Sequence, residues 1–231
     1  MAHMTDIAPL DGSGSFQAYV AEPAGKPRGA IVVIQEIFGV NPGIRQMCDG
    51  WAAEGYLALA PDLFWRMEPG VQLDADNEQE MARGFDFYGK FDRDKGIADI
   101  EATIKTARAM SGGKVGVVGY CLGGLLAFLT ATRTDADAIV SYYGAGIDQQ
   151  LHESHAIGKP LMMHLAKADK YIGPDAQKAI HEALDGNRHV TIHDYEGQDH
   201  AFARAIGSAR NEEAANKADG RTRAFFAEHL G

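Results

Sequence analysis

The sequence lacks the features that mark membrane-spanning and secreted proteins. No apolar run approaches the roughly 20 residues needed to cross a bilayer, and none has the flanks of a signal peptide. Only two cysteines, Cys48 and Cys121, are present, and no CxxC pair occurs. This excludes a disulfide framework and favours a reducing compartment. We therefore expect a cytoplasmic protein whose core, at 45% hydrophobic residues, requires no disulfide or structural metal.

Positive charge is also scarce. Lysine and arginine total 22 against 32 aspartate and glutamate residues, which gives a formal net charge of −10. Nucleic acids and anionic membranes are bound through basic patches, so neither is expected as a partner. The same negative field repels small anions. A site for an anionic substrate would therefore need an arginine of its own.

Internal repeats, low-complexity tracts and linkers are absent from the 231 residues. We expect a single domain over residues 5–231 and a monomer. The opening Met-Ala-His-Met, residues 1–4, resembles a cloning remnant before a natural start at Met4. A chain of this length is sufficient for one α/β domain.

The chain does contain a regular alternation of short apolar segments with longer amphipathic ones. This pattern predicts an α/β fold, a mostly parallel sheet with helices on both faces. Ligands of such sheets bind beyond the carboxyl ends of the strands. Strands are expected at 30–35, 56–60, 114–118, 138–143, 160–166 and 189–195, and helices at 44–54, 78–88, 95–110, 122–132, 175–184 and 212–230. The residues that follow strands are Glu36, Asp62, Cys121, Tyr143, Gly144, Asp169 and His200.

The stretch GYCLGG, residues 119–124, has the form of a nucleophile elbow with cysteine in place of serine. Glycines on either side allow the strand and the helix to approach closely, and the turn directs the side chain of Cys121 outward. The helix N-terminus favours a thiolate and provides free N–H groups for an oxyanion. The alternative is a buried structural cysteine in a glycine-rich turn.

Two later strand-end residues could complete a triad with Cys121. In α/β-hydrolases the chain order is nucleophile, acid, histidine, and here Asp169 and His200 follow in that order. His200 would serve as general base, and Asp169 would hold its orientation. Asp199 is a rival acid, although adjacent residues seldom point at each other. Asp175 stands at a helix start and is typical of a first-turn acid.

The remaining histidine pairs give a weaker signal. His189 and His193 lie four residues apart on one expected strand and could share a face, and LHESH contains His152 and His155. The first pair could face one side as metal ligands would, although ordinary strand residues are the favoured interpretation, and the second pair lacks the spacing of a known zinc motif. We expect no metal and no organic cofactor.

Five blocks of the sequence together resemble one family. They are QEIFGVN at 35–41, PDLF at 61–64, GYCLGG at 119–124, YYG at 142–144 and HAFAR at 200–204. The sequence is similar in these blocks to the dienelactone hydrolases, or carboxymethylenebutenolidases, and the blocks extend over essentially the whole chain. The resemblance implies the α/β-hydrolase fold.

The resemblance also implies roles for individual residues. The family triad falls on Cys121, Asp169 and His200. The family glutamate falls on Glu36, which in such enzymes contacts the resting cysteine and moves away when substrate binds. A carboxylate beside a thiol opposes its ionisation, so this movement would release the thiolate.

Further positions carried over from the family concern substrate binding. Backbone N–H groups of Ile37 and Leu122 would form the oxyanion hole, and Arg204 would bind a substrate carboxylate. The position of the family's second arginine falls on Met81. Arg83 lies two residues later, where a helix turns a side chain to another face. Either a local gap brings Arg83 into the site or the site has one arginine.

These residues predict a hydrolase that opens a small, carboxylate-bearing enol lactone through a thioester, as in aromatic catabolism through chlorocatechols. A broader esterase or thioesterase on the same site is the alternative that Met81 motivates. A redox-sensing protein with a reactive cysteine and no turnover is a third possibility, which the triad order disfavours.

Overall fold

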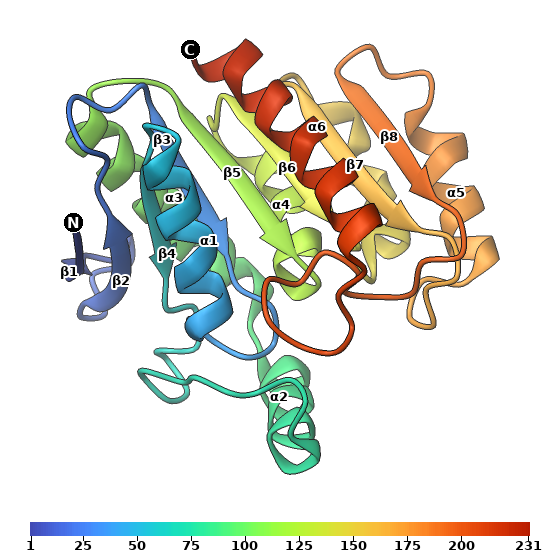
Figure 1. Ribbon diagram of the computed structural model, residues 1–231, viewed down its shortest axis with the longest axis horizontal. Helices are drawn as coiled ribbons and strands as arrows, with labels where there is room; N and C mark the ends of the chain where they lie inside the picture. Colours follow the sequence, from blue (N-terminus) through green and yellow to red (C-terminus); the bar gives the residue numbers. More distant parts are fainter.

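A sheet of eight strands runs through the computed structural model, which describes all 231 residues (Figure 1). The strand order is β1-β2-β4-β3-β5-β6-β7-β8, in which β3 to β8 are parallel to one another and β1 and β2 join in antiparallel fashion. The strands are β1 (Ala2–Ile7), β2 (Phe16–Ala21), β3 (Ala30–Ile34), β4 (Leu57–Pro61), β5 (Val115–Tyr120), β6 (Ala138–Tyr142), β7 (Leu161–Ala166) and β8 (Val190–Tyr195).

Helices cover both faces of this sheet, as the alternation predicts. On one face lie α1 (Pro42–Ala53) and α6 (Glu212–Leu230). On the other lie α3 (Arg93–Ser111), α4 (Leu122–Arg133), the 3-10 helix η1 (Ile147–Ala156) and α5 (Pro174–Leu184). The remaining helix, α2 (Glu78–Lys90), stands beyond the carboxyl ends of the strands, apart from both layers (Figure 1). No helix combines the length and apolar character needed to cross a bilayer.

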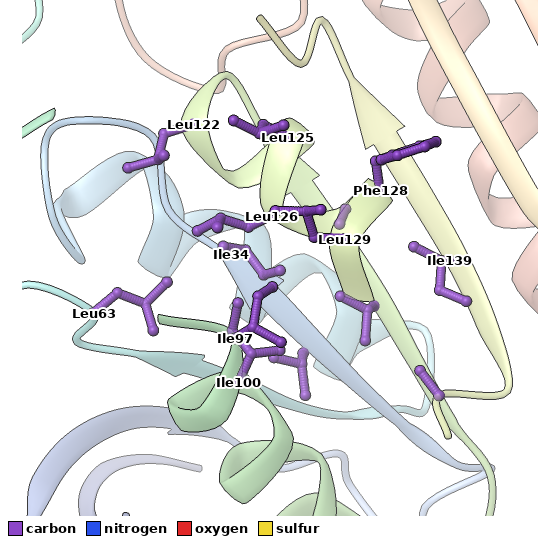
Figure 2. Close-up of a cluster of buried hydrophobic side chains, with 14 of the residues drawn as sticks. Ile34, Leu63, Ile97, Ile100, Leu122, Leu125, Leu126, Phe128, Leu129 and Ile139 are labelled. Carbon is purple, nitrogen blue, oxygen red and sulfur yellow. The ribbon is translucent and has the colours of Figure 1, made fainter. Parts of the chain in front are cut away.

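Alternation along the buried strands divides the apolar side chains between two cores. In β3, Val32 and Ile34 join the core under α3 and α4, whereas Ile31 and Val33 join the core under α1 and α6. Figure 2 shows Ile34 among side chains of α3 and α4. Each fully buried side chain of this size stabilises the fold by about 1.5–3 kcal/mol. Cys48 lies in the second core with no exposed surface.

Four helices begin with a side-chain cap, and helix α4 does not. Side chains of Asn41, Asn77, Asp92 and Asn211 cap α1, α2, α3 and α6 by accepting hydrogen bonds from first-turn N–H groups. Helices α4 and α5 have no side-chain cap, and the N-cap of α4 is Cys121. The N–H groups at the start of α4 are therefore free of side-chain partners.

Glycines bring β5, α4 and β6 into backbone contact. A Cβ built on Gly119 would lie 1.9 Å from the carbonyl oxygen of Gly123, and one on Gly124 would lie 2.3 Å from that of Tyr142. No side chain fits at either place. The elbow therefore requires these glycines for close approach.

The predicted elements agree with the observed ones to within two residues at their ends. Three elements were missed, namely β1, β2 and η1. Strand β1 is mostly exposed and polar, so it carries little hydrophobic signal. It begins at Ala2, which pairs with Ala21, so residues 2–4 belong to the paired strand. Strand β4 extends one residue past the predicted end, to Pro61, which lies opposite Ala18.

Replacing Gly119 with alanine tests the backbone contact. Because the added Cβ would overlap the Gly123 carbonyl, we expect Gly119→Ala to lower the free energy of unfolding by about 3 kcal/mol or more. Gly220→Ala is the matched control, since Gly220 lies in α6 with open space around it. It should raise stability by up to about 1 kcal/mol. Urea unfolding measures both, and equal stabilities for the two variants would contradict the contact.

Candidate active site

The backbone of Cys121 adopts an unusual conformation at the end of β5. Its φ of 56° is in the left-handed region, one of three such non-glycine cases in the chain. The Cys121 N–H donates to the Tyr142 carbonyl at 3.1 Å, and the Cys121 carbonyl accepts from Gly124 and Leu125. A strained residue held by its neighbours in this way is typical of a functional position.

The thiol faces a cavity of about 380 Å³ at the carboxyl ends of the strands. Its wall comes from α2, η1 and the elbow, and from the loops after β3, β4, β6, β7 and β8. A larger hollow of about 540 Å³ lies between α1 and α6 and does not contain the cysteine. The residues lining the smaller cavity are Ile37, Phe38, Ala75, Asp76, Met81, Phe85, Tyr88, Cys121, Ala145, Gly146, Gln149, Lys170, Tyr171, His200, Ala201, Arg204, Ser208 and Ala209.

A buried histidine–carboxylate pair stands at this cavity. Nδ1 of His200 lies 2.8 Å from Oδ2 of Asp169, and both side chains are almost fully buried. Asp169 also accepts from the Tyr171 N–H at 2.8 Å, which fixes its carboxylate. The rival acid, Asp199, accepts instead from the backbone N–H groups of Lys170 and His200. Asp169 is thus the carboxylate bonded to the imidazole.

The imidazole is held in its charged form by its surroundings. Burial lowers the pKa of His200, but the electrostatic influence of the Cys121 sulfur and the hydrogen bond to Asp169 outweigh it and raise the pKa to about 10. The buried Nε2 has no hydrogen-bond partner. An imidazolium beside a cysteine favours nucleophilic attack by its sulfur.

A second buried ion pair lies in the same site. Arg204 donates from Nε to one carboxylate oxygen of Glu36 at 2.7 Å and from Nη2 to the other at 3.2 Å. Its guanidinium carbon lies 5.0 Å from the ring centroid of Phe38. Burial alone would lower the pKa of Arg204, but the Glu36 carboxylate raises it. The hydrogen bonds of Glu36 therefore go to Arg204, whereas the resemblance implies a resting contact with Cys121.

The two backbone amides expected to bind an oxyanion belong to Leu122 and Ile37. Leu122 is the first residue of α4, so its N–H has no partner within the helix. Ile37 lines the cavity from the loop after β3. A Cβ built on Gly84 would lie only 2.9 Å from the Ile37 carbonyl oxygen, so α2 packs directly on this loop.

Arg83 is not part of the cavity. Its guanidinium pairs with Glu68 at the surface, and its side chain is about half exposed. Met81 lines the cavity instead, as expected from the helical turn that separates the two positions. The structure therefore does not bring Arg83 to the place of a second anchor, and Arg204 is the one arginine in the wall.

The other residues singled out by sequence lie elsewhere. Asp62 supports the loop that follows it by accepting from the N–H groups of Phe64 and Gly70. No group of three or more His, Cys, Asp or Glu side chains is arranged to hold a metal. Asp175 is in the first turn of α5, His152 and His155 lie in η1, His189 precedes β8, and His193 stacks on His164.

Sequence reasoning assigned no role to two tyrosines at the site. The ring of Tyr171 meets that of His200 edge-on at 4.9 Å. Tyr143 has a φ of 38°, its ring lies 5.1 Å from that of His200, and its buried hydroxyl has no partner. Both follow strand ends, and Tyr143 belongs to the YYG block. Position in the sheet was therefore the available signal.

Comparison with known proteins adds to this geometry. A family model described as the dienelactone hydrolase family matches residues 16–230. The chain belongs to this family. The family is hydrolytic, and the protein is an enzyme of that class.

Individual relatives extend over nearly the full chain. A carboxymethylenebutenolidase of Pseudomonas putida is 38% identical over 215 residues, covering 92% of this chain and 91% of the relative. A candidate carboxymethylenebutenolidase of Azospirillum brasilense is 48% identical over 236 residues, covering 99% and 100%. The crystal structure of a candidate dienelactone hydrolase from Klebsiella pneumoniae has a TM-score of 0.86 at 27% identity and covers 99% of both chains.

The charge state of the imidazole in this dienelactone hydrolase family member is open to direct test. Because the Cys121 sulfur is the largest influence that raises the His200 pKa, Cys121→Ala should lower that pKa from about 10. At pH 8 the His200 ring should be protonated in the wild type, and the variant should lose that proton at lower pH. An NMR titration of the His200 ring measures the change. An unaltered midpoint in the variant would rule out the pairing.

Proposed function

We propose that the protein hydrolyses the ester bond of a small enol lactone that carries a carboxylate, in the manner of dienelactone to maleylacetate. One observation carries the proposal. The Cys121 elbow, the Asp169–His200 pair and Arg204 all meet at one cavity. Cys121 supplies a nucleophile, the Asp169–His200 pair supplies a general base, and the guanidinium of Arg204 supplies a carboxylate anchor. The names of the P. putida and A. brasilense relatives support the same substrate class.

The reaction is proposed to proceed in two steps. The Cys121 thiolate attacks the lactone carbonyl, and the N–H groups of Ile37 and Leu122 hold the oxyanion. Collapse of the intermediate breaks the ring C–O bond, expels an enolate and leaves a thioester. The expelled enolate then takes the proton of the His200 imidazolium, which leaves the ring neutral for the next step. A water molecule then gives its proton to His200, forms a C–O bond with the thioester carbon, and releases the thiolate. Since an enolate is a good leaving group, the first step needs little help from an acid.

Binding of the substrate carboxylate would rearrange the buried ion pair. Both carboxylate oxygens of Glu36 are bonded to Arg204 through Nε and Nη2, which leaves other N–H donors of the guanidinium for a second carboxylate. The incoming carboxylate would share the single positive charge with Glu36 and so weaken the hold of Arg204 on it. Glu36 would move as a consequence, so anchoring of substrate is linked to the electrostatics around the sulfur.

Removal of the nucleophile tests the proposed reaction. Hydrolysis of a dienelactone, followed by loss of its ultraviolet absorbance, should fall at least about a thousandfold in Cys121→Ala. Cys48→Ala is the control, because Cys48 is buried in the core away from the cavity. An inert wild type, or an active Cys121→Ala, would refute the proposal.

The anchor is tested by a pair of arginine variants. Arg204→Ala should lower kcat/KM for the carboxylate-bearing lactone by about 30-fold or more, because truncating a buried charge partner costs about 2 kcal/mol or more. Arg83→Ala should leave kcat/KM within twofold, since its guanidinium lies at the surface. Steady-state kinetics compares them. Equal losses in the two variants would show that Arg83 reaches the substrate after all.

A broader small-ester or thioester hydrolase is the second candidate, and the apolar Met81 in the wall favours it. The same assay separates the two candidates. Simple nitrophenyl esters would exceed the lactone in kcat/KM, and their hydrolysis would still depend on Cys121.

A further inference from the structure

One side of the cavity is an apolar wall, made by Met81, Phe85 and Tyr88 of α2 and by Tyr171 of the loop after β7. The three α2 residues follow the i, i+4, i+7 spacing of a single helix face. The rings of Phe85 and Tyr171 are 6.1 Å apart at their centroids. The two side chains are large, yet Phe85 is 44% and Tyr171 47% exposed, and both line the cavity. The wall therefore presents uncovered aromatic surface to whatever enters.

Helix α2, which carries most of the apolar wall, packs against the loop that bears Ile37. Gly84 brings α2 against the carbonyl of Ile37, and Phe87 stacks on Phe64 at 4.9 Å. These two contacts lie on the same side of α2 and position the helix beyond the sheet (Figure 1). The apolar face is thus preformed, and it adjoins an expected oxyanion amide.

The arginine and the lysine that line the cavity are each already paired with a carboxylate. The charge of Arg204 is met by Glu36, and the carboxylate of Asp76 lies nearby. Lys170 is the one other lysine or arginine in the lining; its Nζ is 3.7 Å from Asp199 and 5.3 Å from the Tyr171 ring centroid. A second substrate anion against α2 would lose hydration without gaining a free cation.

We propose, on the basis of the function above, that this wall selects lactones or esters with one carboxylate for Arg204 and an apolar, preferably aromatic, group elsewhere. The apolar group packs against Phe85 and Tyr171, and Met81 and Tyr88 complete the surface that it contacts. These are specificity-determining residues. The second anionic group of a dicarboxylate has no partner there.

The position of Tyr171 links this choice to catalysis. Its ring packs edge-on against His200, and its N–H donates to Asp169. A group that packs on Tyr171 is therefore held beside the imidazole. Preference for the apolar group should appear chiefly in KM, since the wall is preformed and binds the group in ground state and transition state alike.

Three enol lactone carboxylates with the same ring test the inference. One carries a methyl substituent, one a phenyl and one a second carboxylate. In the wild type, kcat/KM for the phenyl compound should exceed that for the dicarboxylate by about tenfold or more. Phe85→Ala should reduce kcat/KM for the phenyl compound at least about fivefold more than kcat/KM for the methyl compound, and the difference should arise from KM. Phe85→Tyr should retain the preference, because it keeps the ring.

The helix itself needs a control. Asp86→Ala alters the next residue of α2, which is exposed and pairs only with Lys90. It should leave the phenyl-to-methyl ratio unchanged. Met81→Arg, which places a cation in the wall, should shift kcat/KM toward the dicarboxylate by about tenfold.

The outcomes separate the two proposals. A wild type that prefers the dicarboxylate, or a phenyl-to-methyl ratio that Phe85→Ala does not change, would overturn the role of the wall while Cys121-dependent hydrolysis stands. The absence of Cys121-dependent turnover of all three compounds would overturn the proposed function, and the selectivity with it. Thermal melting of each variant identifies any loss that comes from unfolding.

Discussion

Backbone contact between β5 and α4 is the constraint on which the site depends. Because Gly119 and Gly123 leave no room for a side chain, the strand turns into the helix within one residue, and that residue is Cys121 with its positive φ. The turn uses the cysteine as N-cap, so the first amides of α4 stay open beside the sulfur. The direction of the thiol and the position of the free N–H groups have one common cause.

The rest of the site consists of two ion pairs, and each pair links two different loops at the carboxyl ends of the strands. Asp169 follows β7 and His200 follows β8, while Glu36 follows β3 and Arg204 again follows β8. Both pairs are buried, where a charge without its partner is costly. The three loops therefore hold one another in place. The loop after β8 takes part in both pairs and so connects the proposed base with the proposed anchor.

Much of this arrangement could be predicted from the sequence, and the reason is the sheet. Continuous apolar runs reveal buried parallel strands, and strand ends meet at one edge, which brings Cys121, Asp169 and His200 into range. Strand β1 escaped prediction because it is exposed and polar. The bonds of Glu36 to Arg204 and the wall on α2 were also out of reach. Both depend on tertiary contacts between segments distant in sequence, which local pattern does not record.

The buried position of Cys48 has a practical consequence. Its sulfur is enclosed in the core between the sheet and the helices α1 and α6, and burial raises its pKa, so it stays a neutral thiol. Cys121, the chain's other cysteine, opens on the cavity. In the folded protein an alkylating reagent can therefore react with only one sulfur, that of Cys121. The number of equivalents consumed equals the number of intact active centres, so the enzyme provides its own active-site titration.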